Sequence, residues 1–250
     1  EKPTLYEQKL KELKDNVQVI EDTAHFDPSR VFSFNLTTKK VQRLTNNTFP
    51  IMEYAASENG KYLVTSHVLS PHYSADANPK PTYYLWNLEN DIKTQILEKG
   101  YQTPGRFTFT KYNSGFYFTS EISSDPEWNG AGISVLHFFD LKSMSVTDIN
   151  RDWDWGLGGG FDLVNNDVVV SLANGTTNKL AYLTKKGASW TKKPIRAGDF
   201  DEHIVLSAFN KNYSKVIYVY STASTPPQFR LAAFKNNRRD VSIAAGEEFI

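Results

Sequence analysis

Ile204-Val-Leu-Ser-Ala-Phe-Asn-Lys-Asn-Tyr-Ser-Lys-Val-Ile-Tyr-Val-Tyr220 opens the stretch that decides the fold, which continues to Ala244. Its apolar runs are rich in β-branched and aromatic side chains, which favour half-buried strands, and polar turn-forming residues separate them. The strands that this stretch predicts are 204–209, 216–220, 228–234 and 240–244. Four antiparallel strands in about forty residues make one twisted sheet, which is too small to be stable alone.

Pro226 and Pro227 lie between the second and third of these strands. Proline lacks a backbone donor and has a fixed φ, so we expect the segment 221–227 to interrupt the sheet. The prediction is therefore an irregular connection across the whole segment.

The third strand of this unit recurs upstream as an apolar and aromatic run that ends at a polar turn. Its counterparts are 30–36, 82–88, 134–141 and 178–183. Their starts are spaced by about fifty residues, which is within the range of propeller and solenoid repeats. A four-stranded unit of that length favours blades of a β-propeller over a sandwich.

The repeats predict an all-β fold: a β-propeller portion with four full four-stranded antiparallel blades, a partial blade and a short N-terminal helix. Thr4 and Glu7 have the spacing of a capping box, and Tyr6 and Leu10 fall on one helical face. We expect a single domain over residues 1–250. Its parts are a helix at 4–14, a partial blade at 15–45 and full blades at 51–97, 106–149, 159–195 and 204–244.

The strands inside these blades follow from the same alternation of apolar and polar residues. In the partial blade we expect a strand at 17–20 and a hairpin of 30–36 with 40–44. In the first three full blades we expect strands at 51–56, 61–66, 82–88, 92–97, 106–110, 116–120, 134–141, 145–149, 160–163, 167–172, 178–184 and 190–195. The many aromatic side chains are interpreted as packing between blades.

Bulk composition excludes several classes of function. The chain has 250 residues and a formal net charge of zero, which gives no electrostatic footprint for nucleic acid or an anionic membrane. No apolar run approaches the roughly 18 residues of a membrane helix. Cysteine is absent, which excludes disulfides and thiolate sites. We expect a soluble protein, and the cytoplasmic and the periplasmic or secreted compartments both stay open.

No catalytic constellation is visible in the sequence. It contains no Gly-x-Ser-x-Gly elbow, no Walker loop and no His-Glu-x-x-His motif. Gly156-Leu-Gly-Gly-Gly160 imitates a phosphate loop, but it precedes a strand and lacks the lysine. We interpret it as a flexible link between blades, and we predict no cofactor.

Histidines and acidic residues give no standard metal site. His67, His72 and Asp76 share one loop, but their spacing matches no known ligand pattern, so we predict no metal. His137 lies in the middle of a strand and is interpreted as a packing or sheet-face residue. Asp152-Trp-Asp-Trp155 has two interpretations: an acidic aromatic lip for a cationic or sugar ligand, or tryptophans packed at a blade junction beside solvated aspartates.

Candidate recognition residues lie in long connections between strands. The segments 67–81 and 121–133 are long for hairpins, and loops on a rigid sheet scaffold often carry binding residues. The second segment contains Asp125, Glu127 and Trp128, which combine an aromatic platform with two carboxylates. This combination suits the free amino terminus of a peptide, so the three are our candidate substrate-binding residues. A merely solvated loop is the competing interpretation.

Three stretches resemble the propeller domain of the prolyl oligopeptidase family of serine peptidases, especially its acylaminoacyl-peptidase and dipeptidyl-peptidase-like members. Phe34–Thr45 is similar to the hairpin that closes a blade in that family, and Tyr54–Leu63 to its Ser-Pro-Asp-Gly-Lys turn, with Glu58 and Asn59 replacing Pro and Asp. Tyr218–Phe229 is similar to its Ser-x-x-Ser-x-Pro-Pro-x-Tyr/Phe phrase and is the most specific of the three. The resemblance covers roughly residues 17–245, and such hairpins also occur in TolB-like propellers.

The resemblance implies a function for the chain. In the family, the propeller caps an α/β-hydrolase domain and limits access to short peptides. The family's catalytic Ser, Asp and His have no counterparts here, so the resemblance implies a non-catalytic, substrate-gating part of a serine exopeptidase or oligopeptidase. Peptide substrate would then be reached through a hydrolase domain outside this chain. The alternative is a TolB-like or WD-like propeller that acts as a protein-interaction module.

An incomplete ring of blades also predicts association. The sheet faces near 17–36 and 228–243 are those that neighbouring blades would cover in a complete propeller. Exposed apolar faces and strand edges promote pairing with other chains. We therefore expect the chain to self-associate or to bind its missing blades.

Overall fold

The computed structural model describes isolated N-terminal residues and most of the chain from Pro28 onward. The described residues are 4, 7, 8, 11, 14, 28–68, 81–98, 101–123, 132–149, 152–165, 167–195, 204–210, 214–233 and 241–245. The chain divides into two units, one formed by 1–51 with 68–79 and the other by 52–67 with 80–250. Among the described residues all assigned elements are strands, and no helix there could cross a membrane.

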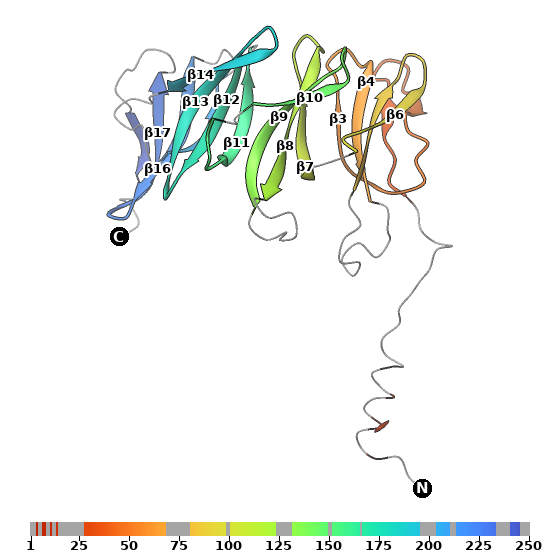
Figure 1. Ribbon diagram of the computed structural model, residues 1–250, viewed down its shortest axis with the longest axis horizontal. Coiled ribbons are helices and arrows are strands. Elements are labelled where there is room, and N and C mark those ends of the chain that lie inside the picture. The colour runs from red at the N-terminus through yellow and green to blue at the C-terminus, as the bar shows by residue number, and fades with distance from the viewer. Residues whose placement is uncertain are drawn as a thin grey trace. The chain divides into compact units, whose positions relative to one another are not determined.

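Four sheets of four strands make up most of the fold, and in each the strands lie side by side in chain order (Figure 1). The first contains β3 (Ile51–Ala56), β4 (Tyr62–His67), β5 (Thr82–Asn87) and β6 (Ile92–Ile96). The second contains β7 (Gln102–Phe109), β8 (Gly115–Ser123), β9 (Gly132–Asp140) and β10 (Ser145–Asp148). The third contains β11 (Leu157–Val164), β12 (Asp167–Asn174), β13 (Thr177–Lys186) and β14 (Ser189–Ile195). The fourth contains β15 (Ile204–Phe209), β16 (Lys215–Thr222), β17 (Thr225–Ala233) and β18 (Val241–Ala245).

These sheets confirm the predicted blades. Each is an antiparallel meander at the place where the sequence predicts a four-stranded unit. Such short-edged sheets, repeated along a chain, are the blades of a β-propeller. The fold class is therefore all-β, as the repeat spacing predicts.

A shared turn explains why the third and fourth strands of a unit follow one another so closely. In three units, the third strand ends at or just before a residue with a short polar side chain: Asn35, Asn87 or Asp140. Each accepts a hydrogen bond through Oδ1 from a backbone N–H two residues on, at 3.0, 3.0 and 2.9 Å. Such Asx turns replace the hydrogen bonds that the strand loses where the chain reverses.

Hydrophobic clusters join each of these sheets to the next one in the chain. One cluster combines Val64 and Leu85 with Phe116 and Phe139, whose rings stack at 4.8 Å between centroids. A second joins β8 and β9 to the β11–β14 sheet, and a third joins that sheet to β16 and β17. Large aromatic rings bury the most apolar area per residue, so they hold neighbouring blades together as expected.

The partial blade is a two-stranded hairpin in the described residues. Strands β1 (Phe32–Phe34) and β2 (Val41–Arg43) pair antiparallel, with Phe34 opposite Val41. All six positions are exposed, including Phe34 at 53% and Val41 at 64%. The hairpin confirms the predicted pairing, and the expected strand at 17–20 lies outside the described residues.

The expected N-terminal helix is not among the elements that the structure describes. Most of the segment 4–14 lies outside the described residues, and its isolated helical positions make up no element. The capping box itself is present: Thr4 N donates to Glu7 Oε2 at 2.7 Å, and Glu7 N donates to Thr4 Oγ1 at 3.4 Å. The hydrogen bonds that Thr4 donates to the Glu7 carboxylate, from its backbone N–H and from its hydroxyl at 2.8 Å, lower the pKa of Glu7.

The glycine run at 156–160 is not a flexible link, and that interpretation was wrong. Residues 157–160 form the first half of β11, with a register shift between Leu157 and Phe161. A Cβ on Gly158 would collide with Asn178 Oδ1, and one on Gly160 would collide with the guanidinium of Arg106. The Arg106 guanidinium can move aside, but a Cβ on Gly158 would also lie 3.0 Å from backbone atoms of Ala173, so close approach to a strand favours glycine at that position.

The two prolines do not interrupt the fourth sheet, which corrects the expectation for 221–227. Strand β17 begins at Thr225 and contains both Pro226 and Pro227. Its pairing with β18 begins only at Gln228, and its pairing with β16 shifts register between Tyr220 and Thr222. The N–H groups that the prolines lack therefore fall where the backbone hydrogen bonding between strands is irregular, or where β17 is paired on one side only. Such positions tolerate proline.

Candidate functional site

The sequence-based candidates lie largely outside the described residues. Asp125, Glu127 and Trp128 are all outside them, so their role in recognition stays a prediction. His72 and Asp76 are outside them as well. Among the residues that the structure describes, no group of three or more His, Asp or Glu side chains is placed to hold a metal.

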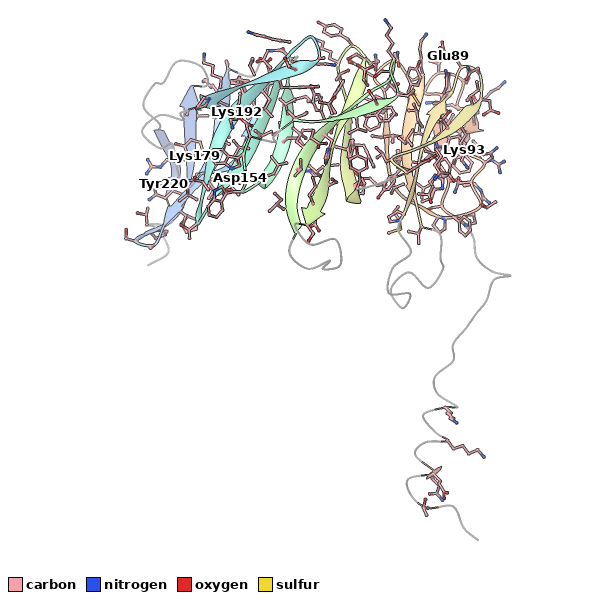
Figure 2. The ribbon with its side chains drawn as sticks, viewed as in Figure 1. Glu89, Lys93, Asp154, Lys179, Lys192 and Tyr220 are labelled. Atoms are coloured by element: carbon pink, nitrogen blue, oxygen red, sulfur yellow. The ribbon has the colours of Figure 1, made fainter. Side chains whose placement is uncertain are left out.

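His67 is a structural residue of the first full blade. It is 2% exposed, and its Nε2 lies 2.7 Å from Thr65 Oγ1, which also accepts a hydrogen bond from Trp86 Nε1 at 2.8 Å. Its ring stacks on Trp86 and meets Tyr84 edge-on. Lys93, labelled in Figure 2, covers Tyr84 at 4.0 Å, and partial burial lowers its pKa. These contacts pack the neighbouring side chains together on one face of the sheet.

The second full blade contains a Ser–His–Asp arrangement that sequence reasoning missed. His137 Nε2 lies 2.6 Å from Ser120 Oγ, and His137 Nδ1 lies 2.8 Å from Asp148 Oδ1. With a proton on Nδ1, the ring donates to the carboxylate and accepts from the serine hydroxyl. These contacts match those of a catalytic triad, in which histidine is the base and aspartate orients it.

Burial prevents this triad-like arrangement from acting on a substrate. Ser120 is 1% exposed and His137 is fully buried, with Phe118 stacked on the imidazole at 4.8 Å and Tyr101 edge-on at 5.1 Å. A nucleophile must reach a substrate carbonyl, and packed aromatic rings occupy the space around this histidine. The three residues instead link the adjacent strands β8, β9 and β10.

One sequence signal could have revealed the pair His137 and Asp148. They are direct register partners across the β9–β10 hairpin. The hairpin was predicted, so counting back from its turn places a carboxylate opposite the histidine. Ser120 is harder to find, because it lies diagonally across the strand pair and its neighbour Thr119 has a similar side chain.

The first strands of three successive sheets meet through a charged contact. Glu53 Oε1 on β3 accepts hydrogen bonds from the backbone N–H groups of Arg106, at 2.6 Å, and Phe107, at 3.3 Å. The Arg106 guanidinium lies 5.9 Å from the ring of Phe161 on β11. Burial raises the pKa of Asp162, and the Arg106 charge opposes that shift. This contact holds β3, β7 and β11 together.

Part of the Asp-Trp-Asp-Trp segment fits the packing interpretation, and part fits the interpretation as an exposed acidic aromatic lip. Trp153 is structural, since its Nε1 donates to Ala173 O at 2.6 Å and it packs on a core cluster. Asp152 forms an ion pair with Lys192 at 2.7 Å. Trp155 is 62% exposed and Asp154 is also exposed, so the second half of the segment presents an open surface.

Comparison with known proteins identifies the fold. No family model matches the sequence, and no curated protein matches it. Dipeptidyl peptidase 4 of Porphyromonas gingivalis is similar in structure, with 11% identity, a TM-score of 0.58, and coverage of 87% of this chain and 36% of that one. Acylaminoacyl peptidase of Pyrococcus horikoshii is similar at 7% identity, a TM-score of 0.54, and coverage of 82% and 33%.

A third solved structure carries a different activity on the same fold. An oligogalacturonate lyase in complex with manganese has 14% identity, a TM-score of 0.60, and coverage of 88% of this chain and 60% of that one. These likenesses define the class: the chain is a β-propeller portion. Its fold is similar to that of the matched parts of the two peptidases, and the chain spans about a third of their length.

Proposed function

We propose that this chain is the non-catalytic, substrate-gating and recognition part of a serine exopeptidase or oligopeptidase. The hydrolase domain lies outside the chain in this proposal. The main support is the share of each chain that the structural match covers. More than four fifths of this chain matches the peptidases, but only about a third of each peptidase is matched. The unmatched two thirds leaves room for a catalytic domain.

The buried Ser–His–Asp arrangement also supports a non-catalytic propeller that works beside a separate catalytic domain. Ser120 is hydrogen-bonded to His137, which also contacts the Asp148 carboxylate. Because Ser120 and His137 are closed off from solvent, this arrangement does not supply hydrolytic chemistry, and the proposal assigns that chemistry to a separate domain. The propeller would then contribute access control and substrate contacts.

An interaction module of the TolB-like or WD-like type is the competing proposal. The same architecture also carries a lyase, so the fold alone does not fix an activity. The two proposals differ in the downstream part of the gene. A peptidase requires a hydrolase domain with its own nucleophile elbow, whereas an interaction module does not.

The discriminating experiment reads and expresses the complete open reading frame. We expect a Gly-x-Ser-x-Gly motif roughly 150 residues after Ile250. The full-length protein should react with a fluorophosphonate probe and hydrolyse short peptides, and replacing the elbow serine by alanine should abolish both. A reading frame without such a domain, or a full-length product that never reacts with the probe, would overturn the peptidase proposal.

A further inference from the structure

Asp154 and Trp155, between β10 and β11, present an acidic and an aromatic side chain to solvent, and we call these two residues the exposed lip. Trp155 is 62% exposed, and Asp154, which Figure 2 labels, is exposed as well. An indole buries a large apolar area when it is covered, so an open one leaves that stabilisation unused. Tryptophan is also among the residues that contribute most to binding at interfaces.

The chain is held in place on both sides of the exposed lip. Before the lip, Trp153 Nε1 donates to Ala173 O at 2.6 Å, and after it Gly156 O accepts from Ala173 N at 3.0 Å. Gly156 has a φ of 68°, and a Cβ there would lie 2.5 Å from the backbone O of Ser134. Glycine therefore lets the chain approach β9 closely. Because both flanks are fixed, little conformational freedom is lost when a ligand binds the lip.

Apolar side chains lie close to the exposed lip. A Cβ on Gly156 would be 3.3 Å from Ile133 Cβ, so Ile133 lies beside the residue that follows Trp155. Ile133 on β9 and Ile122 on β8 are register partners, and they are 38% and 39% exposed. A ligand that covers both the indole and these side chains has to carry an apolar group next to its polar one.

The charge of the exposed lip favours a cation. In the described part of the chain the Asp154 carboxylate forms no ion pair and no hydrogen bond, whereas Asp152 is paired with Lys192. A cation is attracted both by an unpaired carboxylate and by the face of an indole ring. A sugar needs several hydrogen-bonding groups around its ring, and the side chains of Ile122 and Ile133 supply none.

We propose that the exposed lip binds a peptide segment in which an arginine stands next to an apolar residue. The guanidinium stacks on Trp155 and donates two hydrogen bonds to the Asp154 carboxylate, and the apolar residue packs on Ile122 and Ile133. Arginine fits better than lysine because its guanidinium is planar, weakly hydrated and able to bind a carboxylate through two donors. This proposal does not depend on the peptidase proposal.

The test measures binding of peptides with both termini blocked to the 250-residue chain by isothermal titration calorimetry. N-acetyl-L-leucyl-L-arginine amide carries the planar cation, the citrulline analogue has the same shape without the charge, and the lysine analogue has the charge without the planar group. We expect saturable binding of the arginine peptide and at least about tenfold weaker binding of the citrulline peptide, with the lysine peptide between them. Equal binding of the arginine and citrulline peptides, or no saturable binding, would overturn the proposal. Tighter binding of the lysine peptide or of maltotriose than of the arginine peptide would overturn it too.

Two variants assign the contacts to their residues. Asp154→Asn should remove the preference for the arginine peptide over the citrulline peptide, and Trp155→Leu should weaken binding of the arginine peptide by at least about fivefold. The matched controls are Glu58→Gln and Tyr112→Leu, an exposed carboxylate and an exposed aromatic ring in other turns, and they should change neither quantity. All four residues are exposed, so the unfolding midpoint should stay unchanged. If Glu58→Gln reduces the preference as much as Asp154→Asn does, the assignment is wrong.

Discussion

His137 Nδ1 on β9 lies 2.8 Å from Asp148 Oδ1 on β10, and the two residues are direct partners in the strand register. The other ring nitrogen contacts Ser120 Oγ at 2.6 Å, so one imidazole links three neighbouring strands. In a catalytic triad the same contacts prepare a nucleophile. Here the ring is fully buried, so the arrangement stabilises a blade.

The first prediction concerns the stability of this blade. Replacing His137 with alanine removes a buried ring and leaves Ser120 and Asp148 without that partner, so the free energy of unfolding should fall by about 3 kcal/mol. Asp148→Asn should cost about 1–2 kcal/mol through the weaker hydrogen bond. Urea unfolding measures both, with the exposed Asp154→Asn as a control that should change stability by less than about 0.5 kcal/mol. Equal midpoints for His137→Ala and the control would contradict a structural role.

The second prediction is that this chain has no peptidase activity of its own. Because Ser120 is buried, the purified chain should not hydrolyse aminoacyl or acyl-aminoacyl chromogenic substrates and should not react with a fluorophosphonate probe. Any background should be the same in Ser120→Ala. Turnover that scales with protein concentration and disappears in Ser120→Ala would show that the arrangement is catalytic after all.

The third prediction concerns the exposed hairpin of the partial blade. Phe34 and Val41 are opposite each other in the register and are 53% and 64% exposed, so the chain should self-associate and bind an apolar dye. The double variant Phe34→Thr, Val41→Thr should reduce both effects without lowering the unfolding midpoint. Light scattering at high protein concentration measures the self-association. A monodisperse monomer without dye binding counts against the prediction.

The fourth prediction tests the loop candidates in the full-length protein. Replacing Asp125, Glu127 and Trp128 with alanine should raise KM for short peptides and leave kcat unchanged, because substrate contacts are lost but the hydrolase chemistry is not. Peptides with a blocked amino terminus should respond less than peptides with a free one. If KM and kcat stay the same across several peptides, the loop has no part in recognition.

The fifth prediction concerns alkaline pH. Burial, with a further contribution from the Asp167 charge, raises the pKa of Tyr182 to about 12. In the unfolded chain tyrosine titrates near pH 10, so the folded state binds this proton more tightly and its stabilising effect is lost as the pH rises from about 10 to 12. Unfolding midpoints should therefore fall over this range, and less steeply in Tyr182→Phe. Identical pH profiles would show that Tyr182 titrates normally.

Local sequence predicts the blades well because strands and tight turns depend on neighbouring residues. The alternation in 204–209 and 216–220 places β15 and β16, and the polar residues after Asn87 and Asp140 place the reversals that follow β5 and β9. Local sequence rules fail where a contact with a residue distant in the sequence determines the structure. The glycine run at 156–160 reads as a flexible link until Arg106, from another sheet, is seen against Gly160.

The sequence by itself determined that the chain is a repeated four-stranded propeller portion, because strand alternation and turn chemistry are local properties that recur at a fixed period. Tertiary structure alone decided that Ser120, His137 and Asp148 meet and that Lys192 on β14 reaches Asp152, which precedes β11 in the chain. Alternation specifies which face a side chain occupies, but not which distant residue lies opposite that face. That choice follows from strand register and from the packing of one blade on the next.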